Sequence, residues 1–96
     1  MEKELELTIL FDIYEGILSS KQKIYFKEYY FENNSLSEIS ENLNVSKNAV
    51  SKSLAKTSKD LYYFENQLKL MEKNKLLEMI KSLNKNEKIT KLLERL

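Results

Sequence analysis

The sequence predicts an all-α fold: a small helical bundle with a helix-turn-helix and C-terminal amphipathic helices. Proline is absent and glycine occurs once in 96 residues, whereas folds built from strands and tight turns usually need both. Apolar residues also recur every three or four positions along most of the chain, as in amphipathic helices. Because a chain of this length buries one modest core, we expect a single domain, residues 1–96, with the helix-turn-helix at about 35–59 and a C-terminal helical extension at about 60–96.

The composition excludes several classes of site. Cysteine and histidine are absent, which excludes zinc sites built on thiolate or imidazole, disulfides, cysteine nucleophiles and histidine general bases. The carboxylates lie in helical stretches mixed with lysine, where a solvated helix face is the usual explanation. No pair of them is placed for acid/base chemistry. The sequence therefore predicts that the protein is not an enzyme and has no catalytic residues, no metal site and no cofactor.

The start of the chain and its apolar runs indicate the compartment. The first residues, MEKELELTILFDIYEGIL, are acidic, whereas a signal peptide begins with basic residues. The apolar runs are far shorter than the roughly 20 residues needed to cross a bilayer. We therefore expect a cytoplasmic protein without a membrane span. Lysine greatly outnumbers arginine, and asparagine and isoleucine are frequent, which favours a bacterium with an A/T-rich genome.

Two helices are expected in the first third of the chain, at about residues 4–18 and 21–31. Ser19 and Gln22 are spaced for a capping box at the start of the second helix. In that arrangement the Ser19 hydroxyl accepts from the amide of Gln22, and the Gln22 side chain accepts from the amide of Ser19. The apolar stripe of the first helix contains Leu5, Ile9, Ile13 and Ile17, widened by Leu10, Tyr14 and Leu18.

The segment SLSEISENLNVSKNAVSKSL, residues 35–54, has the pattern of two short helices joined by a tight turn. Ser35 and Glu38 fit a second capping box, which predicts a helix at 36–43. Ser40 is the small residue expected where the two helices cross. The buried stripe of this helix is Leu36, Ile39 and Leu43.

The turn and the following helix have their own signals. Asn44 tolerates the positive φ that such a turn requires, and Ser46 can cap the next helix. The sequence shows no strong stop before Asn74, and it leaves open whether residues 47–73 form one helix or two. Two closing helical segments are separated by a turn at residues 84–86. The inward face of the long segment is expected to contain Val50, Leu54 and Leu61.

A helix-turn-helix can present its second helix to the major groove of DNA. Ser46 and the first amides of that helix can hold a phosphate. Asn48 is suited to adenine, and Lys47 or Lys52 to guanine or to a phosphate. Lys56 and Lys59 are better placed for backbone contact, which adds affinity without sequence information. The residues expected to bind DNA are Ser46, Lys47, Asn48, Ser51, Lys52, Lys56 and Lys59.

The charge is distributed unevenly along the chain. Residues 46–59 contain four lysines and no acidic residue, whereas residues 1–18 contain one lysine and five acidic residues. A basic stripe on one helix is the usual footprint of phosphate binding. The alternative is a solvated helix face in a lysine-rich proteome.

Residues 10–50, LFDIYEGILSSKQKIYFKEYYFENNSLSEISENLNVSKNAV, resemble the YlxM-type helix-turn-helix family of bacteria. The resemblance rests on the segments LFDxY, SKQK, YY and SLxEI, where x is any residue. The part of the chain after about residue 61 resembles the family only loosely. The motif is also similar to region 4 of sigma factors, where a Leu-Thr-x-x-Gln entry precedes it, as Leu18-Ser19-Ser20-Lys21-Gln22 does here. The resemblance implies an all-helical bundle with a sigma region 4-like helix-turn-helix and a regulatory role.

The resemblance also implies a partner. The family is associated with the signal recognition particle pathway because its genes lie beside genes of that pathway, so a protein or RNA of that particle becomes a candidate partner. The family commonly has Val-Ser-Arg-Gln-Ala-Val where this chain has VSKNAV at residues 45–50. Lys47 lacks the planar fork of arginine, so the DNA site of this protein can differ from that of its relatives.

Two functions stay open at the level of sequence. One is a regulatory protein that binds double-stranded DNA. The other is a protein- or RNA-binding adaptor of the signal recognition particle pathway without specific DNA reading, whose acidic first helix and C-terminal helices are partner surfaces. The C-terminal helices also carry more Leu, Ile and Met than a small bundle readily buries, which favours a homodimer. The alternative is that these helices fold back on the first helix and close one core.

Overall fold

The computed structural model describes residues 2–83 and 87–95, and the architecture of this part is helical. The predicted all-α class is confirmed. A 3₁₀ turn at Glu15–Ile17 follows the first helix, and a π-helical segment at Lys27–Phe31 follows the second. The turn predicted at residues 84–86 lies outside the described residues. The α-helices are α1 (Lys3–Tyr14), α2 (Ser20–Phe26), α3 (Leu36–Leu43), α4 (Lys47–Leu68), α5 (Leu70–Leu83) and α6 (Glu87–Glu94).

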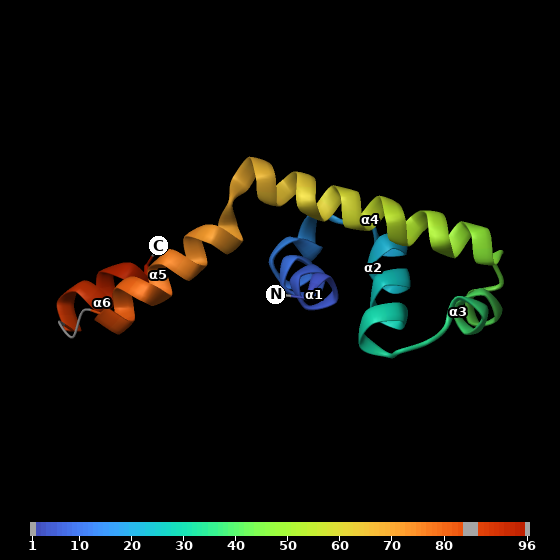
Figure 1. Ribbon diagram of the computed structural model, residues 1–96, viewed down its shortest axis with the longest axis horizontal. Helices are drawn as coiled ribbons and strands as arrows, with labels where there is room; N and C mark the ends of the chain where they lie inside the picture. The colour runs from blue at the N-terminus through green and yellow to red at the C-terminus, as the bar shows by residue number, and fades with distance from the viewer. Residues whose placement is uncertain (1, 84–86, 96) are drawn as a thin grey trace.

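The long helix α4 organises the molecule. Helices α1, α2 and α3 pack along one side of it, and α5 leaves its end at an angle and carries α6 away from them (Figure 1). The molecule is therefore elongated, with extents of 54 × 24 × 22 Å. The C-terminal helices do not fold back to close the core. Within the described part, α5 has no buried residue, and it reaches the core through Met71.

The first core cluster joins α1, α2 and α4. Its centre is a stacked pair, Phe11 and Phe26, with ring centroids 4.4 Å apart and planes only 3° from parallel. Tyr30 lies against Phe26 at a centroid distance of 4.4 Å. Such aromatic pairs contribute about 0.5–1.5 kcal/mol beyond their buried area. The buried residues of this cluster are Leu7, Leu10, Phe11, Tyr14, Leu18, Phe26 and Leu61.

The structure corrects the apolar stripe predicted for the first helix. Leu10, Tyr14 and Leu18 are buried as expected, but Leu5 is 54% exposed and Ile17 is 58% exposed. The helix has apolar residues on two sides, and each side satisfies the helical period. Packing against α4 buries the side that contains Leu7 rather than the side that contains Leu5.

The second core cluster holds the helix-turn-helix together. It contains Tyr25, Ile39, Val50 and Leu54, which come from α2, α3 and α4. The inward positions predicted on α4 are confirmed, because Val50 and Leu54 are buried here and Leu61 is buried in the first cluster. Burying one side of the amino-terminal half of α4 leaves its opposite side free to face solvent.

Local hydrogen bonds set the ends of α2 and α3 as the sequence predicts. Both capping boxes form, at Ser19 with Gln22 and at Ser35 with Glu38. The amide of Glu38 donates to the Ser35 hydroxyl at 3.1 Å, and the Ser35 amide donates to the Glu38 carboxylate at 3.0 Å. The second helix differs from its predicted course, because the α-helical hydrogen bonds stop at Phe26 and a π-type bond joins the Glu32 amide to the Lys27 carbonyl at 2.9 Å.

The turn between α3 and α4 is fixed by three polar side chains, of Ser40, Asn44 and Ser46, and by the backbone around them. Asn44 adopts a left-handed conformation with φ 54°, which asparagine accepts more readily than most residues. The Ser40 hydroxyl donates to the Val45 carbonyl at 2.6 Å, while the Val45 amide donates to the Ser40 carbonyl at 3.1 Å. The Ser46 hydroxyl then accepts from the amide of Ala49 at 3.0 Å and caps α4.

The long segment that begins at Lys47 is two helices, and the break falls at Lys69. This residue is left-handed, with φ 53°. The Glu65 carboxylate caps α5 by accepting from the amides of Met71 at 3.0 Å and Glu72 at 3.2 Å. The Tyr14 hydroxyl donates to the same carboxylate at 2.7 Å and accepts from the Leu70 amide at 3.2 Å. A residue of α1 therefore helps to set where α4 ends.

We expect Lys69→Gly to stabilise the protein, because glycine adopts a positive φ without the steric cost that lysine pays. The gain is about 0.5–1 kcal/mol, after the extra flexibility of the unfolded chain is deducted. The matched control is Lys73→Gly, inside α5, which should cost about 1 kcal/mol. Thermal unfolding of the two variants beside the wild type measures both effects. A loss of stability in Lys69→Gly would contradict the left-handed break.

Candidate nucleic-acid interface

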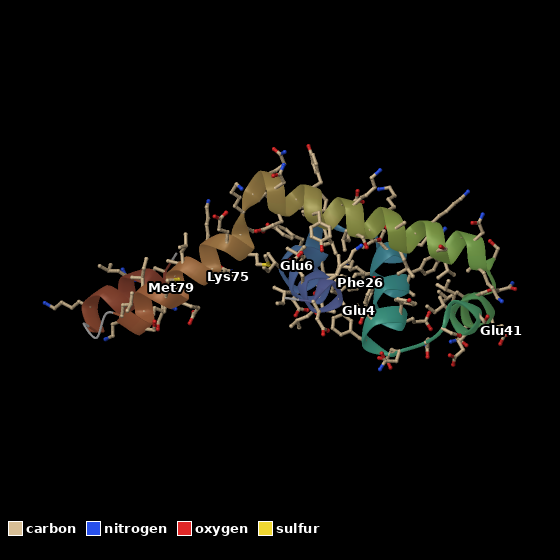
Figure 2. All side chains as sticks on the ribbon, in the orientation of Figure 1. Glu4, Glu6, Phe26, Glu41, Lys75 and Met79 are labelled. Carbon is tan, nitrogen blue, oxygen red and sulfur yellow. The ribbon has the colours of Figure 1, made fainter. Side chains whose placement is uncertain are left out.

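The seven residues predicted to bind DNA are all exposed, on α4 or at its cap. Asn48, Lys52 and Lys59 share one side of α4, four and seven residues apart, and this side is opposite to the buried residues. Figure 2 shows nitrogen-tipped side chains along the outer side of α4, away from α1, α2 and α3. The structure therefore brings these three predicted residues into a row that faces solvent. We call Asn48, Lys52 and Lys59 the basic row.

The other predicted residues lie at the edges of this row. Lys47 is in the first turn, directly after the cap residue Ser46. Ser51 faces the side of the π-helical segment, where it lines a hollow of about 220 Å³ together with Tyr29 and Leu36. Tyr29 was not singled out by sequence reasoning, because it lies 22 positions before Ser51 in the chain.

Lys56 has an acidic partner that the charge count over residues 46–59 does not reveal. Its ammonium lies 2.8 Å from a carboxylate oxygen of Asp60, one helical turn further along α4. The side-chain amide nitrogen of Gln22 donates to the same carboxylate oxygen at 2.9 Å. The hydrogen bond from Lys56 holds the pKa of the Asp60 carboxyl below its usual value, although partial burial opposes this shift. Asp60 thus stays ionised and offsets part of the Lys56 charge.

The structure adds Lys21 to the candidate interface. A hollow of about 560 Å³ lies between the start of α2 and the outer side of α4, and Lys21, Lys52 and Lys56 all line it. The ammonium of Lys21 lies 5.7 Å from the ring centroid of Tyr25. Sequence reasoning missed Lys21 because 31 positions separate it from Lys52. Only the packing of α2 on α4 brings the two lysines to one hollow.

The acidic residues of α1 lie on the other side of the molecule. Figure 2 labels Glu4 and Glu6 on α1, across α4 from its nitrogen-tipped outer side. This arrangement separates the two signs of charge that the sequence places at residues 1–18 and 46–59. A polyanion that approaches the outer side of α4 therefore meets the positive field first.

Two further properties of the described residues concern the requirements of a metal site and of a membrane span. Among them, no group of three or more acidic side chains is close enough to hold a metal ion. None of the helices over residues 2–83 and 87–95 is both long enough and apolar enough to cross a membrane.

Comparison with known proteins places this helix-turn-helix in a family. The sequence matches, over residues 1–96, the UPF0122 family, described as "Putative helix-turn-helix protein, YlxM / p13 like". The chain belongs to this family. The predicted resemblance is therefore confirmed, and the match extends beyond the segment 10–50 on which the resemblance rests.

Members of the UPF0122 family from several bacteria are similar to this chain. A UPF0122 protein of Mycoplasma capricolum is 49% identical, over 91% of this chain and 75% of its own length. The UPF0122 protein YlxM of Bacillus subtilis is 38% identical, over the whole of this chain and 94% of its own length. A UPF0122 protein of Malacoplasma penetrans is 40% identical, over 96% of this chain and 90% of its own length.

Proposed function

We propose that this protein is a regulatory protein that binds double-stranded DNA through the outer side of α4. The observation that carries the proposal is the basic row on a helix whose opposite side is buried in a helix-turn-helix core. Burial fixes the direction of that side, the left-handed Asn44 ends α3, and the Ser46 cap fixes where α4 begins. A preformed, exposed and positively charged helix is suited to enter a major groove.

The residues of this face would divide into two roles. Asn48 and Lys52, near the amino terminus of α4, would approach base edges, since an amide side chain suits adenine and an ammonium suits guanine. Lys59 lies about two helical turns after Lys52 and would contact phosphates. Lys21 and Lys56 would contact phosphates from the adjoining hollow. Ser46 and the free amides of the first turn would hold a further phosphate.

The test measures binding to a duplex of random sequence at several salt concentrations. We expect Lys59→Ala to weaken binding to all duplexes alike and to reduce the salt slope by about one. Lys56→Ala should have a smaller effect, because Asp60 already neutralises part of that charge. The control is Lys3→Ala on α1, which removes the same charge on the other side of α4. Fluorescence anisotropy of a labelled duplex provides the readout.

Two results would contradict the proposal. The first is binding that does not depend on salt, since phosphate contacts release counterions. The second is an equal loss in the Lys3 and Lys59 variants, which would mean that net charge rather than this face matters. The same titration with signal recognition particle RNA tests the second function expected from the sequence. Clear preference for that RNA would replace the DNA-binding regulator with the adaptor.

The proposal extends to cell compartment, chemistry and assembly. A regulatory protein of this kind would act in the bacterial cytoplasm and would not be an enzyme. As a homodimer it would present two copies of α4. If those copies lie on one face, about 34–36 Å apart, they would fit a DNA site with two half-sites.

A further inference from the structure

Helix α1 has a second apolar side that its own chain leaves largely uncovered. Leu5 and Ile17 are more than half exposed, and Ile9 and Ile13 between them are only partly buried. Leu5, Ile9 and Ile13 recur every four positions along α1, and Ile17, at the end of the 3₁₀ turn that follows, continues the same spacing. A helix that is apolar on both sides is normally covered on both sides. The single chain therefore covers this stripe only in part, near Ile9 and Ile13.

Helix α5 faces this stripe across a groove. Ile9 and Ile13 line one wall, and Met71 and Met79 line the other, around a volume of about 770 Å³ whose lining is mostly apolar. Met79 is 58% exposed. Figure 2 labels Met79 and Lys75 on the length of α5 that extends beyond the core helices. Further exposed apolar residues of α5 are Leu70, Leu76, Ile80 and Leu83.

The surface of the single chain is larger than its mass explains. It exposes 7031 Å², whereas a compact monomer of 11.4 kDa exposes about 5,800 Å². The excess of about 1,200 Å² exceeds the roughly 800 Å² that each partner buries in a standard stable interface. The radius of gyration is 17.0 Å, and a compact domain of this length has about 12.5 Å. The shape thus has enough spare surface for a dimer.

We propose that the groove between α1 and α5 is the dimer interface, and that its occupant is α5 of a second copy of this chain. Each α5 would lie in the groove of the other copy, so that Met79 of one chain meets Ile9 and Ile13 of its partner. This arrangement is isologous, because one surface supplies both the groove and the helix that fills it. The proposal rests on the homodimer proposed above and names its surface.

Charge favours the second copy as the occupant. Residues 1–18 carry a net charge of −4, whereas residues 70–95 carry seven basic and four acidic side chains, a net charge of +3. Docking α5 and α6 against α1 of another copy would bring these opposite charges together. Complementary fields of this kind steer association and fix its orientation.

The first experiment measures the mass of the full chain in solution by light scattering, without nucleic acid. We expect twice the chain mass of 11.4 kDa for the wild type and the single mass for Met79→Asp. The matched control is Tyr63→Asp on α4, where the side chain is 62% exposed and does not line the groove. This control should stay dimeric. Circular dichroism checks that both variants keep their helix content.

A second measurement does not depend on disrupting the interface. The chain has no cysteine, so single cysteines can be placed at will. A tagged Ile9→Cys chain is mixed with an untagged Met79→Cys chain and treated with a short bismaleimide. We expect a covalent species of double mass that contains both chains. A Tyr63→Cys chain in place of the Met79→Cys chain should give none.

Each outcome separates this proposal from DNA binding. A wild-type monomer at all concentrations would overturn the proposed interface, even if the protein binds DNA. A dimer that persists in Met79→Asp and does not cross-link would place the interface elsewhere and also overturn it. A dimer that forms through this interface but does not bind DNA would support the proposed interface and would contradict the proposed function instead.

Discussion

Replacing Phe26 by Ala is expected to lower the free energy of unfolding by about 3–5 kcal/mol. Phe26 is fully buried, stacks on Phe11 and contacts Tyr30. Removing its ring leaves a cavity at the junction of α1, α2 and α4, where neighbouring helices cannot close the space. A change of this size should lower the melting temperature by at least about 12 °C for a domain of this length.

The matched control is Phe31→Ala. Phe31 follows closely on the same stretch of chain, with its ring centroid 6.1 Å from that of Phe26, but its side chain is nearly half exposed. We expect its loss to cost much less, because water already reaches one side of the ring. Thermal unfolding followed by circular dichroism compares the two variants. Equal destabilisation would mean that Phe26 is not at the centre of the core.

The second large effect is expected at Glu65, which joins α4, α5 and α1. Partial burial raises the pKa of Glu65. Hydrogen bonds from Tyr14 and from the backbone amides of Met71 and Glu72 lower it by more, so the pKa is lowered from 4.5. The folded state therefore binds this proton less readily than the unfolded state. The stabilisation is complete above about pH 4.5 and is lost as the pH falls through the lowered folded pKa.

We expect Glu65→Gln to cost about 1–2 kcal/mol at pH 7, comparable with the loss of a helix cap. A glutamine offers one acceptor oxygen where the carboxylate offers two, and it cannot serve both amides of α5 and Tyr14. Below pH 4.5 the difference between variant and wild type should shrink, because the wild-type carboxylate is then being protonated. Thermal unfolding between pH 3 and pH 7 measures this convergence.

The control for Glu65 is Glu41→Gln, which removes an exposed carboxylate from α3 (Figure 2). It should change the melting temperature little at any pH in this range. If Glu65→Gln proved as stable as the wild type at pH 7, the Glu65 cap would not be what fixes the start of α5. The angle at which α5 leaves the core would then need another cause.

The local features of the helix-turn-helix could be predicted because their causes lie within a few residues. Ser19, Ser35 and Ser46 each cap a helix by binding an amide three positions later. Asn44 takes a positive φ, which its own side-chain type favours. The exposure of the predicted DNA-binding residues follows from the same local period, while their role stays a prediction.

Other features could not be predicted because their causes lie far apart in the chain. The sequence around Lys69 contains no turn signal, and the Glu65 carboxylate that caps α5 is held by Tyr14, 51 positions earlier. Lys21 joins Lys52 and Lys56 only through the packing of α2 on α4. Each of these contacts joins segments that are far apart in the chain, and a repeating pattern of apolar residues within one segment does not show which other segment packs against it.

The sequence by itself determined the helical class, the three serine caps, the turn at Asn44 and the side of α4 that faces solvent, because short-range hydrogen bonds and one helical period specify them. Tertiary structure alone decided which apolar side of α1 is buried and where α4 gives way to α5. The physical reason is that both sides of α1 satisfy the same period, so only the shape of the helices that pack on it can choose between Leu7 and Leu5.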